Sequence, residues 1–414
     1  MSLSNITLTA SVRQNLLSLQ GTAELLATTQ GRLATGKKVN SALDNPTNFF
    51  TAAGLDARAS DISNLLDSIG NGVQVLQAAN TGITSLSKLV DTAKSIANQV
   101  LQQPSGYTSK ATVGIAAPTG AGALSTVGTA SDLTAGGVNS LQGKTLVFKT
   151  ASGTTTLTLS NVAGAGNVNS IDSINTALSA AGVELTASFN TNGSVQFTST
   201  NNAASQTITA TGAYAAPPAG SSTSVDVSGT ATFGAVTAAV QDAVSQATRA
   251  NLVSQYNQII TQITTTAQDA SFNGINLLNG DSLKLVFNET GKSTVTIAGV
   301  TFNPAGLGLG NLVSGTSFID NASTNVVLTA LNTASITLRS QASAFGANLS
   351  IVQIRQDFNK NLINVLQTGS AALTLADTNE EAANSQALST RQSIATSALS
   401  LANQSQQSVL QLLR

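Results

Sequence analysis

The chain has 414 residues and a formal net charge of −1, and only 9% of its residues are charged, against roughly 25% in an average soluble protein. It contains no cysteine, no histidine and no tryptophan. These absences exclude disulfides, thiol nucleophiles, imidazole bases and Cys/His metal sites, and the missing basic excess argues against a nucleic-acid partner. A weakly charged, nearly neutral surface favours association between copies of the chain.

The N-terminal stretch MSLSNITLTASVRQNLL has no basic segment, no continuous apolar run and no small-residue cleavage site. No run of 18 apolar residues occurs anywhere in the sequence, so we expect no membrane insertion. If the protein is exported, we expect a route that does not use a cleaved signal peptide.

The first predicted element is a helix within residues 8–33, where apolar residues recur at steps of three and four. This stripe contains Val12, Leu16, Leu19, Leu26 and Leu33. Chain ends normally fray, so an apolar stripe at an end needs a surface on which to dock, in the same subunit or in another.

A heptad repeat follows between residues 62 and 100. One set of positions spaced by seven contains Ile62, Ile69, Leu76, Ile83 and Val90. A period of 3.5 residues predicts a helix that supercoils around a partner, and at 1.5 Å per residue it would be roughly 58 Å long. A helix of that length cannot bury its narrow apolar stripe alone.

Between 104 and 235 the helical period disappears, and Gly, Thr, Ala and Ser dominate. Residues 144–162 predict a β-hairpin around Ser152-Gly153, and residues 184–200 predict a second one with Asn192-Gly193 at its turn. Between them, residues 170–183 predict a short helix with Ser170 as N-cap and Gly182 as its stop. The sequence thus predicts an α+β region inserted into a helical chain.

Helical spacing returns at 236–266, and a strand-rich stretch follows at 283–302. Within that stretch, TGKST (290–294) resembles the end of a phosphate-binding loop, but position 286 is Val where that loop needs Gly. A hairpin turn is the better interpretation.

A second heptad pattern, from 328 to 373, offers a partner for the first. Its apolar positions include Leu331, Leu338, Phe345, Leu349, Val352 and Ile363. Asn359 also falls on this seam, where a polar residue lowers stability but can fix register. We therefore expect a mainly α fold: a long antiparallel coiled coil or helix bundle built from both chain ends, with an inserted α+β outer domain and a β-hairpin patch.

A last stripe ends the chain. It contains Ile394, Leu401, Val409, Leu410 and Leu413. With the stripe at 8–33 it forms a pair of apolar faces that we expect to pack against neighbouring subunits.

Three segments, in this order, resemble bacterial flagellin: GRLATGKKVNSALDNP (31–46), SFNGINLLNG (271–280) and SLANQSQQSVLQLLR (400–414). Residues 167–200 also resemble a small module inserted in flagellins and hook-associated proteins. The resemblance implies terminal helices at 1–35 and 375–414 in the inner filament layer. It further implies a helical core from 36–104 and 236–374 with its hairpin at 283–302, and an outer domain at 105–235. The large insertion precedes the FNG segment here, whereas in familiar flagellins the variable domain follows it.

The resemblance implies a secreted, non-enzymatic structural subunit that polymerises into the extracellular flagellar filament for swimming motility, alone or mixed with other flagellins. It implies type III export, an export chaperone, cap and junction proteins as partners, and no cofactor or metal. Lys88 and Thr92 stand where receptor-activating flagellins carry Arg and Leu, and Asn251 lies near the place of an acidic residue. Weak or no activation of the host toll-like receptor for flagellin follows, because Lys cannot make the bidentate contacts of Arg.

Two alternatives remain open at this point. A hook–filament junction protein shares the terminal helices and the small inserted module. An adhesin or tail-fibre-like module using 104–235 would leave the matching segments at both ends unexplained.

Overall fold

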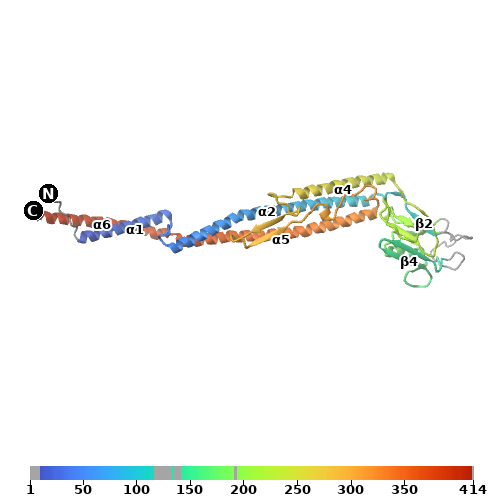
Figure 1. Cartoon of the computed structure of the whole chain (residues 1–414), viewed down its shortest axis with the longest axis horizontal. Helices are drawn as coiled ribbons and strands as arrows, with labels where there is room; N and C mark the ends of the chain where they lie inside the picture. The colour runs from blue at the N-terminus through green and yellow to red at the C-terminus, as the bar shows by residue number, and fades with distance from the viewer. Residues whose placement is uncertain (1–9, 116–132, 135–140, 191–193, 413–414) are drawn as a thin grey trace, which may run out of the picture. The chain divides into compact units, whose positions relative to one another are not determined.

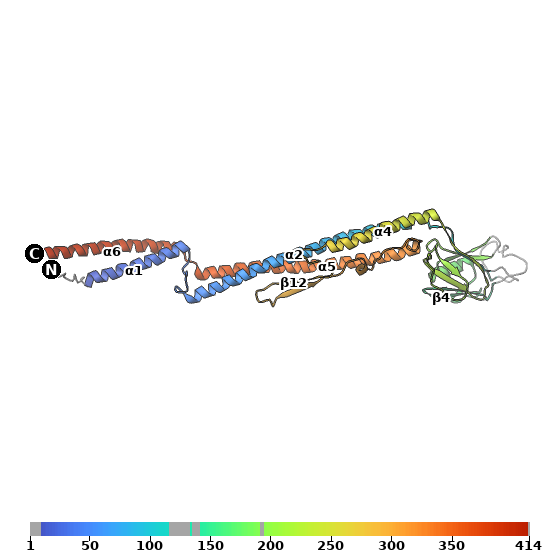
Figure 2. The same cartoon turned by 45° about the horizontal axis from the view of Figure 1, so that its top comes forward.

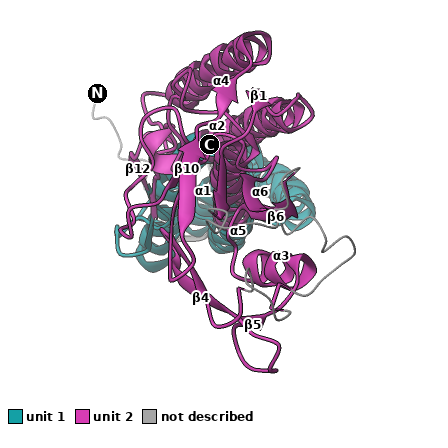
Figure 3. Cartoon of the chain, turned by 90° about the vertical axis from the view of Figure 1, so that its right-hand side faces the viewer, with its two compact units in different colours: residues 1–73, 284–296, 350–414 teal, residues 74–283, 297–349 magenta. Residues whose placement is uncertain are grey.

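The computed structural model describes residues 10–115, 133–134, 141–190 and 194–412 (Figure 1). The chain forms two compact units, residues 1–73, 284–296 and 350–414 in unit 1 and residues 74–283 and 297–349 in unit 2 (Figure 3). Two long helices, α2 (Pro46–Leu101) and α5 (Asn321–Thr374), contribute residues to both units. The chain ends are helical and the middle holds a β-rich insert, which agrees with the fold class that the sequence predicts.

Unit 1 contains the terminal helices α1 (Ala10–Thr35) and α6 (Thr378–Leu412), which pack on each other (Figures 1 and 2). Helix α2 begins with Pro46, whose missing N–H costs nothing in a first turn, and Asn45 caps it by accepting a hydrogen bond from the Asn48 N–H at 3.0 Å. The two connecting segments also pair, since Lys38 N donates to Thr374 O at 2.7 Å. The helix termini of unit 1 are therefore held together by the backbone as well as by side chains.

The unit 1 portions of α2 and α5 share a small apolar cluster. Ala59 and Ile62 of α2 are buried against Leu366 of α5, with Leu55 and Leu362 beside them. This contact joins the two heptad stripes that the sequence predicts as partners.

In unit 2, α2 and α5 are joined by α4 (Ala243–Asp269), which Asp242 caps through the Ser245 N–H. The sequence pattern predicts this helix from residue 236, and that start is wrong. Residues 233–237 form β10 and residues 240–241 form β11, and Val240 of β11 is exposed. Val244 lies in the first turn of α4 and is exposed as well. Valines spaced by four fit a helix, but β-branched residues equally favour strands.

The insert belongs to unit 2 and contains two main sheets. One has the order β10-β2-β7-β6 and the other the order β5-β4-β3-β9-β8, and β1 pairs with β11 separately. The remaining bounds are β1 Tyr107–Ser109, β2 Thr112–Ile115, β3 Thr145–Thr150, β4 Gly153–Leu159, β5 Asn167–Val168, β6 Leu185–Phe189, β7 Val195–Ser199, β8 Thr207–Thr209, β9 Ser224–Ser228, β10 Phe233–Thr237 and β11 Val240–Gln241.

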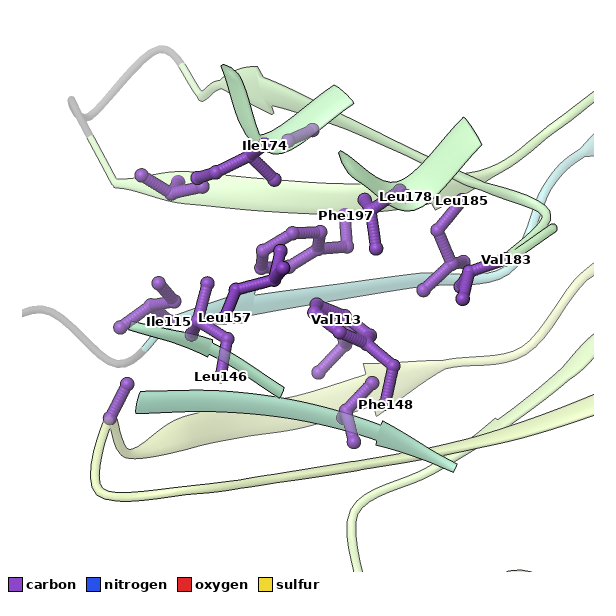
Figure 4. Packing of buried hydrophobic residues seen from close by; sticks show 14 of the residues in the cluster. Val113, Ile115, Leu146, Phe148, Leu157, Ile174, Leu178, Val183, Leu185 and Phe197 are labelled. Atoms are coloured by element: carbon purple, nitrogen blue, oxygen red, sulfur yellow. The ribbon is translucent and has the colours of Figure 1, made fainter. Parts of the chain in front are cut away.

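Both sheets and helix α3 (Ile171–Ala180) bury side chains in one core (Figure 4). Alternate residues of β3 and β7 point inward, as the two-residue period of a strand requires. Phe148 of one sheet meets Phe197 of the other edge to face, with ring centroids 5.3 Å apart. The insert therefore has its own hydrophobic core.

Both predicted hairpins are present in the insert. Strands β3 and β4 pair antiparallel with Thr150 opposite Gly153, which places the turn at Ala151-Ser152. Strands β6 and β7 pair antiparallel as well, and the predicted turn at Asn192-Gly193 includes residues outside those that the structure describes.

The short helix α3 begins and ends where the sequence predicts. Ser170 and Ser173 form a reciprocal capping box at its start. At its end Gly182 adopts a φ of +67°, and the Val183 N–H donates to Leu178 O at 2.9 Å. This six-to-one bond across a left-handed glycine is a Schellman motif, and Leu178 and Val183 complete it by both being buried.

The predicted strand-rich patch forms the two-stranded sheet of β12 (Ser282–Val286) and β13 (Thr294–Ala298). The TGKST segment lies at its turn, where Phe287 N donates to Ser293 O at 2.8 Å. The preceding FNG segment closes the end of α4, because the Asn276 amide donates to Ala267 O and Gln268 O. No helix among the described residues carries an apolar stretch sufficient to cross a lipid bilayer.

Candidate assembly surface of the helical ends

The terminal helices meet along a seam of heptad spacing. On α1 the seam contains Val12, which is only 3% exposed, and the half-buried Leu19 and Leu26. On α6 the half-buried seam positions are Leu388, Gln392, Ala395, Leu399 and Ala402. An ion pair between Arg32 Nη1 and Glu381 Oε1, at 3.3 Å, lies where the two helices approach their linkers.

Four large apolar side chains of the same helices lie outside this seam. Leu17 is 73% exposed and Leu25 is 58% exposed on α1, while Ile394 is 64% exposed and Leu401 is 69% exposed on α6. Large apolar side chains at such exposure leave hydrophobic surface in water, which contact with another molecule would cover. We call these four residues the outward set.

The residues predicted for filament packing divide between the two faces. Val12, Leu19 and Leu26 lie on the seam, whereas Leu16, Leu33, Ile394 and Leu401 are exposed. Leu413 lies outside the described residues, and so do the side chains of Val409 and Leu410. Leu17 and Leu25 of the outward set, and Leu388 and Leu399 of the seam, were missed, because each predicted stripe follows a single line of residues along its helix and these four lie off that line.

The residues predicted for the coiled coil within the subunit are mostly inaccessible. The side chains exposed by 1% or less are those of Ile62, Ile69, Leu76, Ile83, Val90, Leu331, Leu338, Phe345 and Val352. Leu349 and Ile363 are half-buried. Burial this complete over both heptad stripes leaves little of these side chains available to another subunit.

The polar seam residue Asn359 has a specific partner within unit 1. Its side chain is 2% exposed, and its Nδ2 donates to the backbone oxygen of Phe287 at 3.0 Å. Arg355 places its guanidinium carbon 5.9 Å from the centre of the Phe287 ring, and Arg58 Nε contacts Glu289 Oε1 at 2.7 Å. These contacts fasten residues 284–296 to α2 and α5, so the seam asparagine is satisfied by the hairpin rather than by the facing helix.

Helix α5 carries a further exposed stripe that sequence reasoning missed. Ile351, Ile354, Phe358 and Val365 are between 47% and 66% exposed and recur at steps of three, four and seven. They share one face of α5 because side chains three and four apart are neighbours on a helix. The signal was present in the sequence, but it runs beside the buried seam, and periodicity alone does not say which of two adjacent stripes is covered.

A buried polar cluster in unit 2 connects the insert to the helices. The Asp320 carboxylate, which is fully buried, accepts hydrogen bonds from Ser205 and Ser222 of the insert and from the Ser323 N–H of α5. The Arg249 guanidinium donates to Phe318 O at 2.9 Å and to Pro104 O. Burial lowers the pKa of Arg249, and the negative charge of Asp320 opposes that effect.

Among the described residues, no group of three or more acidic side chains is placed to hold a metal ion. The paired carboxylates Glu380 and Glu381 lie in the first turn of α6, where negative charge suits the helix dipole.

Comparison with known proteins identifies the family of the two helical ends of the chain. Residues 6–114 match the bacterial flagellin N-terminal helical region, and residues 328–413 match the bacterial flagellin C-terminal helical region. The chain belongs to the flagellin family. The two matched regions contain α1, α2, α6 and most of α5, and therefore the seam, the outward set and the exposed stripe of α5.

Individual flagellins resemble the chain over about two fifths of its length. It is 33% identical over 165 residues to flagellin FljM of Caulobacter vibrioides, covering 39% of this chain and 59% of that protein. It is 30% identical over 179 residues to flagellin FljO of the same organism, covering 43% and 64%. A flagellin of Brucella melitensis is 28% identical over 177 residues, covering 40% and 62%. The chain thus spans about three fifths of the length of these relatives.

Proposed function

We propose that the protein is a structural subunit that polymerises into the extracellular flagellar filament for swimming motility, and that it is not an enzyme. The observation that carries the proposal is the outward set. The terminal helices already bury one apolar face against each other, yet Leu17, Leu25, Ile394 and Leu401 stay exposed on the other. Membership of the flagellin family supports a neighbouring copy of the chain as the molecule that covers them.

The energetics of such an interface are favourable. Burying one Leu or Ile side chain completely contributes roughly 1.5–3 kcal/mol. The outward set is repeated in every subunit. A contact between two different faces of the same molecule gives an open helical polymer, unless the rotation between successive subunits closes it into a ring. We expect Leu16 and Leu33, at the edge of this face, and the final residues Val409, Leu410 and Leu413 to extend the contact.

The domain arrangement is part of the proposal. Residues 1–35 and 375–414 would form the inner layer of the filament. Residues 36–104 and 236–374, with the hairpin at 283–302, would form the helical core, and residues 105–235 the outer domain. The second boundary moves from 235 to 241, because β10 and β11 pair with β2 and β1 of the insert. The separate hydrophobic core of the insert supports its treatment as a domain of its own.

Deletion of residues 400–414 tests the proposal. The deleted chain should form no filaments in electron micrographs, while the unfolding of its insert stays as in the full chain. Its helical circular dichroism should fall only by the contribution of the removed end of α6. A finer test combines Ile394→Gln with Leu401→Gln and compares it with the matched control Ser393→Gln with Ser400→Gln on the same helix. Assembly should fail in the first variant and persist in the second, and normal filaments from the deletion or from the first variant would refute the assignment.

A hook–filament junction protein is the alternative within the flagellum. The relatives described above are named as flagellins, which favours the filament subunit. Electron microscopy of purified protein after reassembly separates the two, because a junction protein forms no long polymer.

Further partners follow from the same proposal. We expect export through the flagellar type III apparatus, with an export chaperone and with cap and junction proteins as transient partners. We also expect weak or no activation of the host flagellin receptor, since Lys88 and Thr92 of α2 and Asn251 of α4 are all exposed and lack the Arg, Leu and acidic pattern. Potency like that of an enterobacterial flagellin in a receptor reporter assay would contradict this expectation.

A further inference from the structure

We propose that the Asp320 carboxylate holds the insert in one fixed orientation on the helices of unit 2, because it joins the start of α5 to two loops of the insert. The chain connects the insert to α2 through residues 102–106 and to α4 through Asp242. A domain on short connections moves relative to its neighbour unless an interface restrains it. Every described residue of the hydrophobic core of the insert lies between 111 and 239, so that core does not itself attach the insert to α4 or α5.

The two oxygens of the Asp320 carboxylate bind different parts of unit 2. Oδ1 accepts a hydrogen bond from the Ser323 N–H at 3.0 Å and so caps the first turn of α5. Oδ2 accepts hydrogen bonds from the Ser205 N–H at 3.2 Å and from the hydroxyls of Ser205 and Ser222. Ser205 lies just before β8 and Ser222 just before β9, and these two strands pair with each other. One carboxylate therefore fixes the approaches to two neighbouring strands of the insert to the start of a helix.

A backbone contact lies beside this carboxylate. The Ala322 N–H of α5 donates to Asn202 O at 2.8 Å, in the segment that leads to β8. We call Asn202, Ser205, Ser222, Asp320 and Ala322 the Asp320 junction. Because its contacts reach two different loops of the insert, the junction restrains rotation of the insert as well as its separation from the helices.

Two side chains of α4 hold the junction in register with the connection that leaves α2. Arg249, which is only 1% exposed, donates to Phe318 O at 2.9 Å and to Pro104 O at 2.8 Å. Gln246, three residues earlier on the same face of α4, donates to one backbone oxygen in each of the same two segments. The backbone just before Asp320 and the first connection to the insert are thus fixed to one helix face.

Burial makes the junction selective for a single arrangement. The Asp320 carboxylate is fully buried, and a buried charge is costly unless hydrogen-bond donors surround it. Hydrogen bonds to an ionised carboxylate are also stronger than those between neutral groups. Any other orientation of the insert would remove the serine donors from Oδ2 and is therefore disfavoured. If the chain polymerises as proposed, every subunit presents the insert in the same orientation; that consequence rests on the proposed function, whereas the junction itself is tested on the single subunit.

Distances between spin labels on the full, unpolymerised chain test the proposal. The chain has no cysteine, so two introduced cysteines take the labels specifically. Ser188→Cys in β6 with Gln258→Cys in α4 forms a pair that spans the insert and the helix, and Ser188→Cys with Thr156→Cys in β4 forms a pair within the insert; all three positions are exposed. Double electron–electron resonance should give one narrow distance distribution for each pair.

Asp320→Ser separates the two roles of the carboxylate. Serine is a good N-cap residue, so it keeps an oxygen for the first turn of α5, but it has no second oxygen for the insert. This variant should lose the narrow distribution of the insert–helix pair and keep that of the pair within the insert. The matched control is Ser323→Ala, which removes the hydroxyl that accepts from the Asp320 N–H and leaves the contacts with the insert in place. It should keep both distributions narrow, even where it lowers the melting temperature.

Three results would overturn the proposal. The first is a broad insert–helix distribution in the chain that carries only the labels. The second is a narrow one that persists in Asp320→Ser, and the third is equal broadening by Ser323→Ala, which would assign the effect to the helix start. If Asp320→Ser also broadens the pair within the insert, Ser205→Ala combined with Ser222→Ala decides instead, because it removes both hydroxyl donors and spares the cap. A narrow insert–helix distribution in that double variant would then overturn the proposal, and a broad one would support it.

Discussion

Replacing Gly82 with alanine tests the close packing that joins α2 to the end of α4. Gly82 is buried within α2, and a Cβ added there would lie 2.6 Å from the Ala270 Cβ and 2.6 Å from Leu278 Cδ1. Leu278 is fully buried, and the Ala270 Cβ moves only if the backbone moves. Overpacking of this kind costs about 1–3 kcal/mol. Alanine in a helix interior recovers about 0.5–1 kcal/mol relative to glycine.

The matched control is Gly346→Ala in α5, where an added Cβ would meet nothing within 4 Å. That variant should gain the helix contribution of about 0.5–1 kcal/mol without the clash. The free energies of unfolding of the two variants, measured by urea titration with circular dichroism, should then differ by about 1–3 kcal/mol. Equal stabilisation by both substitutions would refute the packing that the structure gives to Gly82.

Three further predictions concern the buried seam, its polar residue and one helix cap. Leu338→Ala removes a fully buried side chain and should destabilise the protein by about 2–5 kcal/mol in urea titrations. Ile336→Ala, at a 66% exposed position, should change stability by less than about 0.5 kcal/mol. Similar losses from both variants would show that the seam is misplaced. Asn359→Ala leaves the buried Phe287 oxygen without its donor and should cost about 1–3 kcal/mol, and no loss would mean that the hairpin is not fastened there. Hydrogen bonds from the first turn of α4 hold the pKa of Asp242 below its ordinary value, and the bond from the Ser245 hydroxyl has the largest effect. The ionised Asp242 therefore contributes its full stabilisation above the pKa of the unfolded chain. That contribution is lost as the pH falls through the lower pKa of the folded chain. Asp242→Asn keeps a capping oxygen and should therefore make stability less dependent on pH below about 4, as followed by thermal unfolding at successive pH values.

Much of the fold follows from the sequence because its periods are long or its local signals are specific. Two heptad stripes predict α2 and α5, since a seam of that length has few other solutions. The limits of α3 follow from one serine and one glycine, because Ser170 caps the first turn and Gly182 takes up the left-handed conformation that stops the last.

The parts that sequence reasoning missed depend on tertiary contacts. The stretch 236–241 becomes β10 and β11 because β2 and β1 offer it strand partners, a choice that valines spaced by four do not reveal. In α1 and α6 each helix has two apolar faces, and only the pairing decides that Leu399 faces the partner helix while Leu401 faces away.

A density map of the native filament shows directly what covers the outward set. We expect Leu17, Leu25, Ile394 and Leu401, which are 58–73% exposed in the single subunit, to be buried against side chains of neighbouring subunits. A filament in which these four side chains remain in contact with solvent would contradict it.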